Sequence, residues 1–201
     1  MKKYIAEIFG TFGLTLVVIA SVSTRFFPVP TTILAGVTLG LFVYTVGHIS
    51  GCHINPAVTI GAWSIRKIKS HEAIAYIICQ FVGAGLAMLI AGALLNLGPV
   101  AHLAIKDTLA VGLAEMIGTV FFTFGIASVI YGKAPSIMSG IVIGGSLFLG
   151  AAIASLLGSS GIVNPAVALG VRSLNWMYLI GPIFGSVIGM NLYQLLESSK
   201  L

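Results

Sequence analysis

The triplet Asn-Pro-Ala occurs twice in this chain, as Asn55-Pro56-Ala57 and as Asn164-Pro165-Ala166. Asparagine is a strong helix N-cap, proline is favoured at the first helical position, and alanine continues a helix at no cost. Each triplet therefore predicts the start of a helix. Within a bilayer, such a start requires protein or a water-filled cavity around it, because its first N–H groups are unsatisfied and its dipole end is positive.

Composition indicates that the chain lies in a membrane. Hydrophobic residues make up 58% and charged residues only 7% of the 201 residues, whereas a soluble domain has about 25% charged residues. The mean hydropathy is +1.09. We expect six spanning helices, since six apolar stretches each approach the roughly 20 residues needed to cross the hydrocarbon core. Their ranges are Tyr4–Val22, Thr31–Ile49, His71–Leu97, Leu109–Tyr131, Ser136–Leu157 and Met177–Leu195.

The two halves of the chain repeat one another. The pattern Ala-Glu-x-x-Gly-Thr begins at Ala6 and again at Ala114, an offset of 108 residues, while Asn55 and Asn164 are separated by 109. We therefore expect a single domain over residues 1–201, made of two repeats of about 1–100 and 108–201. Because each repeat holds an odd number of spans, the second repeat enters the membrane from the opposite face, which makes the repeats inverted.

The segments that follow the triplets are too short to cross a bilayer. Pro56–Ile65 has ten residues and Pro165–Ser173 has nine. Helices of this length reach about 15 Å, roughly half of the bilayer. Two half-helices entering from opposite faces would bring the side chains of Asn55 and Asn164 together near the midplane. Their dipole ends would disfavour cations there, whereas a neutral molecule could accept hydrogen bonds from the two amides.

These residues resemble the signature of a known family. The segment Gly47–Gly51 followed by His53–Thr59, which reads His-Ile-Asn-Pro-Ala-Val-Thr, is similar to the first repeat of the aquaporin and aquaglyceroporin family. The resemblance covers nearly the whole chain, including both triplets, both Ala-Glu-x-x-Gly-Thr openings and Gln80 in the third span. It implies an all-α integral membrane protein with six transmembrane helices and two half-helices in an hourglass fold. It also implies a pore through each subunit and a homotetramer.

The chain departs from the family at the outer selectivity filter. The family normally places an arginine directly after the second triplet, and this chain has Val167 there. The other three positions that resemble the filter are Ala35, Ala152 and Gly161, none of which is aromatic or histidine. We expect a wide, apolar outer mouth that passes water and small uncharged solutes such as glycerol. A hydrophobic constriction that sheds water and slows its passage is the second interpretation of the same residues.

Two carboxylates lie deep inside spans, Glu7 and Glu115. An intramembrane carboxylate is a candidate functional residue, and a proton relay is one interpretation. Because the two residues occupy equivalent positions in the repeats, and because the family resemblance points the same way, we favour a structural role. Each would accept hydrogen bonds from the backbone of the loop before the triplet in its own half.

The loop before the first triplet contains His53. Irregular backbone cannot face lipid, so this loop must line a cavity, and the sequence predicts that His53 lines the pore on its cytoplasmic side. His48 falls in the second span and is expected to be packed and hydrogen-bonded.

The net charge of +5 follows topology and does not indicate nucleic acid as a partner. With a cytoplasmic N-terminus, seven basic residues face the cytoplasm and three face outward, which satisfies the positive-inside rule. The inner ones are Lys2, Lys3, Arg66, Lys67, Lys69, Lys133 and Lys200, and the outer ones are Arg25, Lys106 and Arg172. We expect an integral protein of the plasma or cell inner membrane, with both termini cytoplasmic. Its expected partners are the lipid bilayer, water and neutral solutes.

Other classes of function remain as alternatives. A secondary transporter is the second interpretation, because inverted repeats with broken helices also describe many carriers. A membrane scaffold or adhesion protein with a closed pore is the third. The sequence contains no nucleophile-base pair, no metal-ligand spacing and no phosphate-binding loop, so neither an enzyme nor a cofactor is expected.

Overall fold

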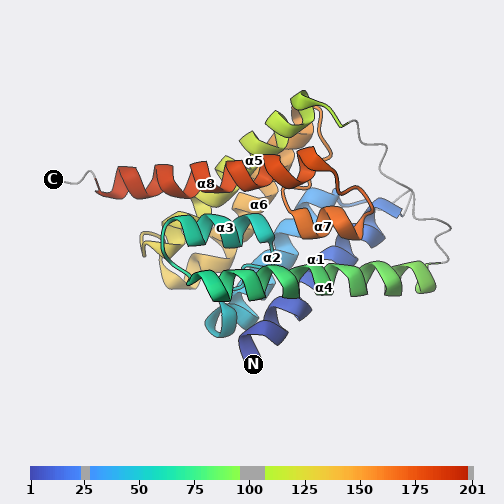
Figure 1. The fold of residues 1–201 in the computed structure, drawn as a ribbon, viewed down its shortest axis with the longest axis horizontal. Coiled ribbons are helices and arrows are strands. Elements are labelled where there is room, and N and C mark those ends of the chain that lie inside the picture. Colours follow the sequence, from blue (N-terminus) through green and yellow to red (C-terminus); the bar gives the residue numbers. More distant parts are fainter. Residues whose placement is uncertain (24–27, 96–106, 199–201) are drawn as a thin grey trace.

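In the computed structural model the regular structure of the described residues, 1–23, 28–95 and 107–198, is entirely helical (Figure 1). Three basic residues of the charge argument, Arg25, Lys106 and Lys200, lie outside these ranges. The elements are α1 (Lys2–Ser23), α2 (Thr31–Ser50), α3 (Pro56–Ser64), α4 (Ser70–Leu94), α5 (Leu109–Ile130), the 3-10 turn η1 (Ser136–Met138), α6 (Ser139–Leu156), α7 (Pro165–Gly170) and α8 (Trp176–Ser198).

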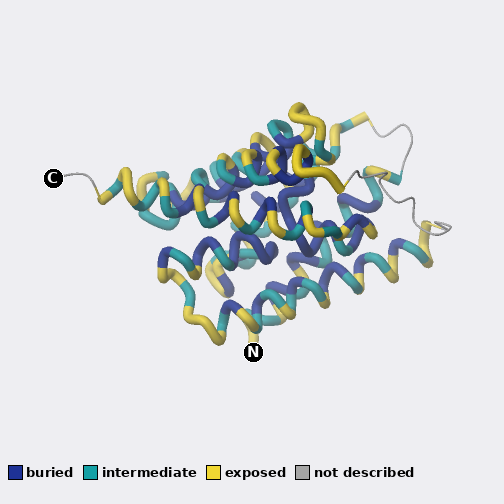
Figure 2. The backbone as a smooth tube through the Cα atoms, turned by 45° about the horizontal axis from the view of Figure 1, so that its top comes forward, coloured by how far each residue is buried: buried dark blue, intermediate teal, exposed yellow. Residues whose placement is uncertain are grey.

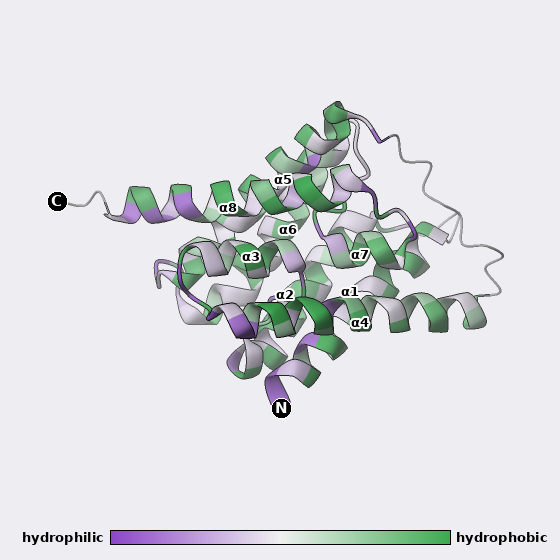
Figure 3. Ribbon diagram, in the orientation of Figure 1, coloured by the Kyte–Doolittle hydropathy of each residue, from purple (hydrophilic) through white to green (hydrophobic). Residues whose placement is uncertain are grey.

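Six of these segments are long and apolar enough to cross a membrane: α1, α2, α4, α5, η1 with α6, and α8. They confirm the six spans expected from the sequence, with ends that differ by a few residues. α4 ends at Leu94, while the last two residues of its expected range lie outside the described part of the chain, and α8 ends at Ser198, three residues beyond the expected Leu195. Green, hydrophobic turns recur along the visible length of the long helices (Figure 3). A helix that is apolar all round suits a bilayer.

Small residues bring the spanning helices close together. α1 packs against α2 and α4, α5 packs against α6 and α8, and α2 packs against α6. At the α2–α6 crossing, a Cβ atom added to Gly36 would lie 2.6 Å from the carbonyl oxygen of Gly144. Glycine there lets the two backbones approach, as is common between transmembrane helices. The buried residues gather along the inward faces of the helices, while exposed residues lie outside (Figure 2).

The two half-helices α3 and α7 lie end to end between the long helices (Figure 1). Both are shorter than expected, since α3 ends at Ser64 and α7 at Gly170. The reason is a Schellman motif at each end, in which an arginine adopts the left-handed conformation, Arg66 with φ 60° and Arg172 with φ 53°. The backbone then turns back, and the amide of Ser173 donates to the carbonyl of Ala168 at 2.8 Å.

Candidate functional site

Both asparagines of the triplets cap the half-helices as predicted. The Asn55 Oδ1 atom accepts a hydrogen bond from the amide of Ala57 at 2.8 Å. The Asn164 Oδ1 atom accepts from the amides of Ala166 and Val167 at 3.0 and 3.4 Å. A proline at the first helical position follows each cap. The side-chain oxygens are thus committed to the helix starts, which fixes the orientation of both amides.

The remaining atoms of the two amides join the half-helices to each other. The Asn55 Nδ2 atom donates to the carbonyl of Val163 at 2.9 Å, and the Asn164 Nδ2 atom donates to the carbonyl of Ile54 at 3.1 Å. Ile54 and Val163 both have positive φ, 38° and 45°. These values are unusual for β-branched residues. The strained conformation aims each carbonyl at the asparagine of the other half, so the two triplets meet.

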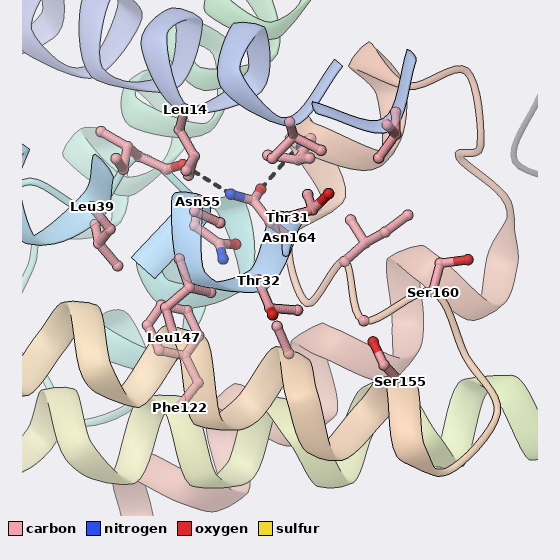
Figure 4. Close-up of a pocket in the computed structure, with 18 of the residues that line it drawn as sticks. Leu14, Thr31, Thr32, Leu39, Asn55, Phe122, Leu147, Ser155, Ser160 and Asn164 are labelled. Carbon is pink, nitrogen blue, oxygen red and sulfur yellow. Dashed lines mark hydrogen bonds between the residues drawn. The ribbon is translucent and has the colours of Figure 1, made fainter. Parts of the chain in front are cut away.

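Each of the two asparagines keeps one side-chain N–H group for a passing molecule. An amide NH₂ group has two N–H donors. One donor of each asparagine goes to a carbonyl of the opposite loop, and among the described residues no acceptor takes the second. Both side chains are 2% exposed and both border the same cavity (Figure 4). The site therefore presents two N–H groups side by side to the cavity. Neither amide oxygen is free to accept a hydrogen bond from a molecule there, because both cap the half-helices.

Glu7 holds the loop that precedes the first triplet. Its Oε1 atom accepts from the Ser50 hydroxyl at 2.6 Å and from the His53 amide at 3.0 Å. Its Oε2 atom accepts from the Ile54 amide at 2.7 Å and from the Gln80 side-chain amide at 2.8 Å. Four hydrogen bonds therefore compensate for the burial of this carboxylate, which is 0% exposed.

Glu115 makes the equivalent contacts in the second half. Its Oε1 atom accepts from the hydroxyl of Ser159 and from the amide of Ile162, the latter at 3.0 Å. Its Oε2 atom accepts from the amide of Val163 at 2.6 Å. The backbone hydrogen bonds expected of both carboxylates are present. The sequence analysis missed Ser50 and Ser159, although each lies five residues before the asparagine of its triplet, a repeat that could have revealed them.

A cavity of about 310 Å³ borders both asparagines and Val167. Of the four residues expected at the outer filter, Ala35, Gly161 and Val167 line it, and Ala152 does not. Ala151, one position earlier in α6 and 2% exposed, lines it instead. The difference has a simple cause, since consecutive residues of a helix point about 100° apart. The remaining walls are mostly apolar, with a few hydroxyl groups: Thr31, Thr32, Ser155 and Ser160.

A second cavity of about 560 Å³ lies on the other side of the His53 loop. His53 is half-buried and borders both cavities. His48 also lines the second cavity and is exposed, so the expectation that it is packed was wrong. Its position at the end of α2, where the helix opens into the loop, accounts for the exposure. We call the two spaces the outer and the inner cavity.

Ionised side chains outside the carboxylate pair lie at the ends of the helices. Lys3 pairs with Glu72, and Lys133 pairs with Glu197 at 2.7 Å. Among the described residues no three His, Cys, Asp or Glu side chains gather closely enough to hold a metal ion. The described cysteines, Cys52 and Cys79, are free thiols. The chemistry of the site is therefore that of hydrogen-bond donors at the meeting point of two half-helices.

Comparison with known proteins agrees with this geometry. Residues 1–193 match the model of the major intrinsic protein family. The chain is 34% identical over 186 residues to aquaporin AqpM of Methanothermobacter marburgensis, covering 81% of this chain and 74% of AqpM. It is 34% identical over 232 residues to aquaporin Z of Rhodopseudomonas palustris, covering 98% of this chain and 93% of the relative.

A solved structure has the same fold as this chain. The X-ray structure of the aquaglyceroporin from Plasmodium falciparum superimposes with a TM-score of 0.77 at 20% identity, and the match covers 98% of this chain and 99% of the other. The paired half-helices, the six apolar helices and the family match together lead to one conclusion: this chain is an integral membrane protein that belongs to the major intrinsic protein family, the channels that include the aquaporins.

Proposed function

We propose that this channel passes water and small uncharged solutes of glycerol size down their concentration gradients. The observation that carries the proposal is the pair of asparagine amides, each with its oxygen used by a helix cap and one N–H left for a solute. A neutral molecule with an oxygen acceptor can replace its water contacts at these donors. A cation cannot, because both groups are donors and both half-helices present the positive end of their dipoles.

The composition of the outer mouth supports solutes larger than water. Val167 occupies the position after the second triplet, and its neighbours across the cavity are Ala35, Ala151 and Gly161. We propose Ala151 in place of Ala152 as the α6 residue of this mouth. No arginine is among the described residues that line the outer cavity. A mouth walled by small apolar side chains excludes solutes less strictly by size than one narrowed by a long cation.

We further propose an inverted-repeat architecture, cytoplasmic termini, a plasma or cell inner membrane location and a homotetramer. The matching carboxylate networks of the two halves support the repeats. The positive-inside rule supports the orientation, because Lys3 at the start of α1 and Lys67 after α3 both contact the ends of other spanning helices. Lys3 pairs with Glu72 at the start of α4, and the Lys67 ammonium lies 4.7 Å from the ring centroid of Tyr131 at the end of α5.

The proposal is tested by reconstituting the chain in proteoliposomes and measuring water, glycerol and urea permeability by stopped-flow light scattering. We expect all three to exceed those of empty vesicles. The substitution Val167→Arg should lower glycerol and urea permeability more than water permeability, because the guanidinium would occupy the outer cavity. Solute permeability that is unchanged in a folded Val167→Arg variant would contradict the proposed role of the outer mouth.

A further inference from the structure

We propose that a ring of three side chains, Leu39, His53 and Phe122, limits both the size and the rate of permeation, and that the outer mouth around Val167 does not. We call these residues the inner ring. The inference rests on the proposed channel function and assigns the selectivity of the same pore to a different place. It starts from the two cavities, because these three residues are the ones that the described walls of both cavities share.

The positions of the cavities identify the barrier between them. Asn55, Asn164 and Val167 all border the outer cavity. A molecule that has passed the outer mouth therefore reaches the asparagines within one continuous space. The inner ring separates that space from the inner cavity. We place the narrowest stretch at this ring, where the two cavities adjoin, whereas the filter expected from the sequence lies around Val167.

The ring is built on three separate elements that hold it in place. Leu39 comes from α2, Phe122 from α5 and His53 from the loop before α3. In Figure 4, Leu39 and Phe122 lie toward the opposite end of the cavity from Ser155 and Ser160. Phe122 is 1% exposed and Leu39 is 2% exposed. Behind Phe122, α6 packs so closely that a Cβ atom added to Gly150 would lie 2.9 Å from the Phe122 Cβ atom. The close approach of α6 and the burial of Phe122 leave its side chain little free space on that side.

A hydrogen bond between Nδ1 and the Thr59 hydroxyl holds the His53 ring. The Thr59 hydroxyl donates its single hydrogen to the Asn55 carbonyl at 3.1 Å and accepts from the Gln80 side-chain amide at 2.9 Å. The His53 Nδ1 atom lies 3.1 Å from the same hydroxyl oxygen. With the hydroxyl hydrogen on the Asn55 carbonyl, Nδ1 is the donor to the Thr59 oxygen. In the neutral imidazole, Nε2 is then an acceptor, and no described residue donates to it.

The inner ring therefore combines two apolar walls with one hydrogen-bond acceptor. The asparagines, which border the same outer cavity, offer N–H donors and no free acceptor of their own. A molecule with hydroxyl groups can donate to His53 and accept from Asn55 and Asn164 as it passes. The ring thus favours water and short polyols, and its walls, Leu39 and Phe122, set how bulky the polyol can be.

A matched pair of leucines tests the inference. Leu39 and Leu14 both line the outer cavity and are 2% and 3% exposed, but Leu39 belongs to the inner ring and Leu14 does not. In proteoliposomes containing the full chain, Leu39→Ala should raise the ratio of erythritol to water permeability about fivefold or more, because passage through the narrowest point limits the flux. Leu14→Ala should change that ratio by less than about twofold.

A second pair covers the case in which Leu39→Ala does not fold, as judged by gel filtration. Leu39→Phe should lower glycerol permeability while Leu14→Phe leaves it closer to the wild-type value. Equal effects of the Leu39 and Leu14 substitutions, with a wild-type channel that conducts glycerol, would overturn the inner ring and leave the channel function intact. An absence of solute and water flux in the wild type and in every folded variant would overturn the channel function, and the inner ring with it.

Discussion

Asn164 is the residue at which capping and permeation can be separated. Its Oδ1 atom caps α7, and its Nδ2 atom donates to the carbonyl of Ile54 and faces the outer cavity. Aspartate is as good an N-cap as asparagine. It has no N–H donor, and it brings a negative charge. The substitution Asn164→Asp therefore preserves the start of the half-helix and inverts the electrostatics of the site.

We expect Asn164→Asp to lower glycerol permeability about fivefold, the effect of losing a hydrogen bond worth about 1 kcal/mol in the pore. Cation leak should rise, because the carboxylate offsets the positive dipole ends. The matched control is Asn175→Asp. Asn175 caps the start of α8 through the amides of Met177 and Tyr178 at 3.0 and 3.1 Å, and it borders neither cavity.

Vesicle swelling in glycerol and a cation-flux assay on the same preparations check this prediction. Asn175→Asp should match the wild type in both. A similar loss of glycerol flux in the two variants would mean that the carboxylate acts through helix stability and not through the pore.

At the scale of elements, the loops before the triplets depend on the buried carboxylates. Each loop contains residues with positive φ, including Cys52 at 52° and Ile54 at 38° in the first half. Backbone strain of this kind costs about 1–3 kcal/mol per residue and persists only when surrounding contacts enforce it. Glu7 supplies those contacts for the first loop and Glu115 for the second.

The substitutions Glu7→Gln and Glu115→Gln should each destabilise the protein by about 1–3 kcal/mol, because an amide NH₂ would face groups that also donate. Glu72→Gln is the control, since Glu72 forms a solvent-accessible ion pair with Lys3, and pairs of this kind contribute little to stability. Thermal unfolding in detergent measures the difference. Melting temperatures of Glu7→Gln and Glu115→Gln no lower than that of Glu72→Gln would contradict the structural role.

Helix packing within one half provides a second test at this scale. In α4, a Cβ atom at Gly83 would collide with the carbonyl oxygen of Ile8 and lie 3.0 Å from the amide nitrogen of Phe12 in α1. A Cβ atom at Gly85 would meet nothing within 4 Å. Gly83→Ala should therefore lower the melting temperature, whereas Gly85→Ala should leave it unchanged or raise it slightly, since alanine is the better helix former. Equal melting temperatures of the Gly83→Ala and Gly85→Ala variants would show that α1 and α4 can move apart without a loss of stability.

The sequence allowed the parts of the fold that depend on local pattern to be predicted. The helix starts at Asn55 and Asn164 and the six spans follow from capping and hydropathy. The loop contacts of Glu7 and Glu115 were expected from the repeat and, above all, from the resemblance to the aquaporin family. The ends of the half-helices were not predicted, because Arg66 and Arg172 adopt a left-handed conformation that an arginine rarely takes.

The cavity walls were harder to predict than the helices. The rotation of α6 places Ala151 on the cavity where Ala152 was expected, and an error of one residue turns a side chain by about 100°. The inner ring joins side chains from α2, α5 and a loop. No spacing along the chain connects Leu39, His53 and Phe122, so only the packed structure brings them to notice.

At the scale of the whole molecule, the two halves form one scaffold around a single path. α2 packs against α6, while the asparagine of each half-helix donates to the loop of the other half. Proteins of this family are channels, and the expectation that the chain is not an enzyme is confirmed by its membership. The path joins the outer and inner cavities across the inner ring, and its donors and dipoles suit uncharged molecules.

The measurement that tests this account most directly compares two isosmotic challenges on one preparation of wild-type proteoliposomes, one with glycerol and one with potassium chloride. We expect the vesicles to swell faster than empty vesicles in glycerol, because the paired asparagine N–H groups can donate hydrogen bonds to the oxygen atoms of an uncharged polyol. In potassium chloride they should behave as empty vesicles do. Failure to swell in glycerol, or equal swelling in the salt, would contradict the claim that this pore selects neutral solutes.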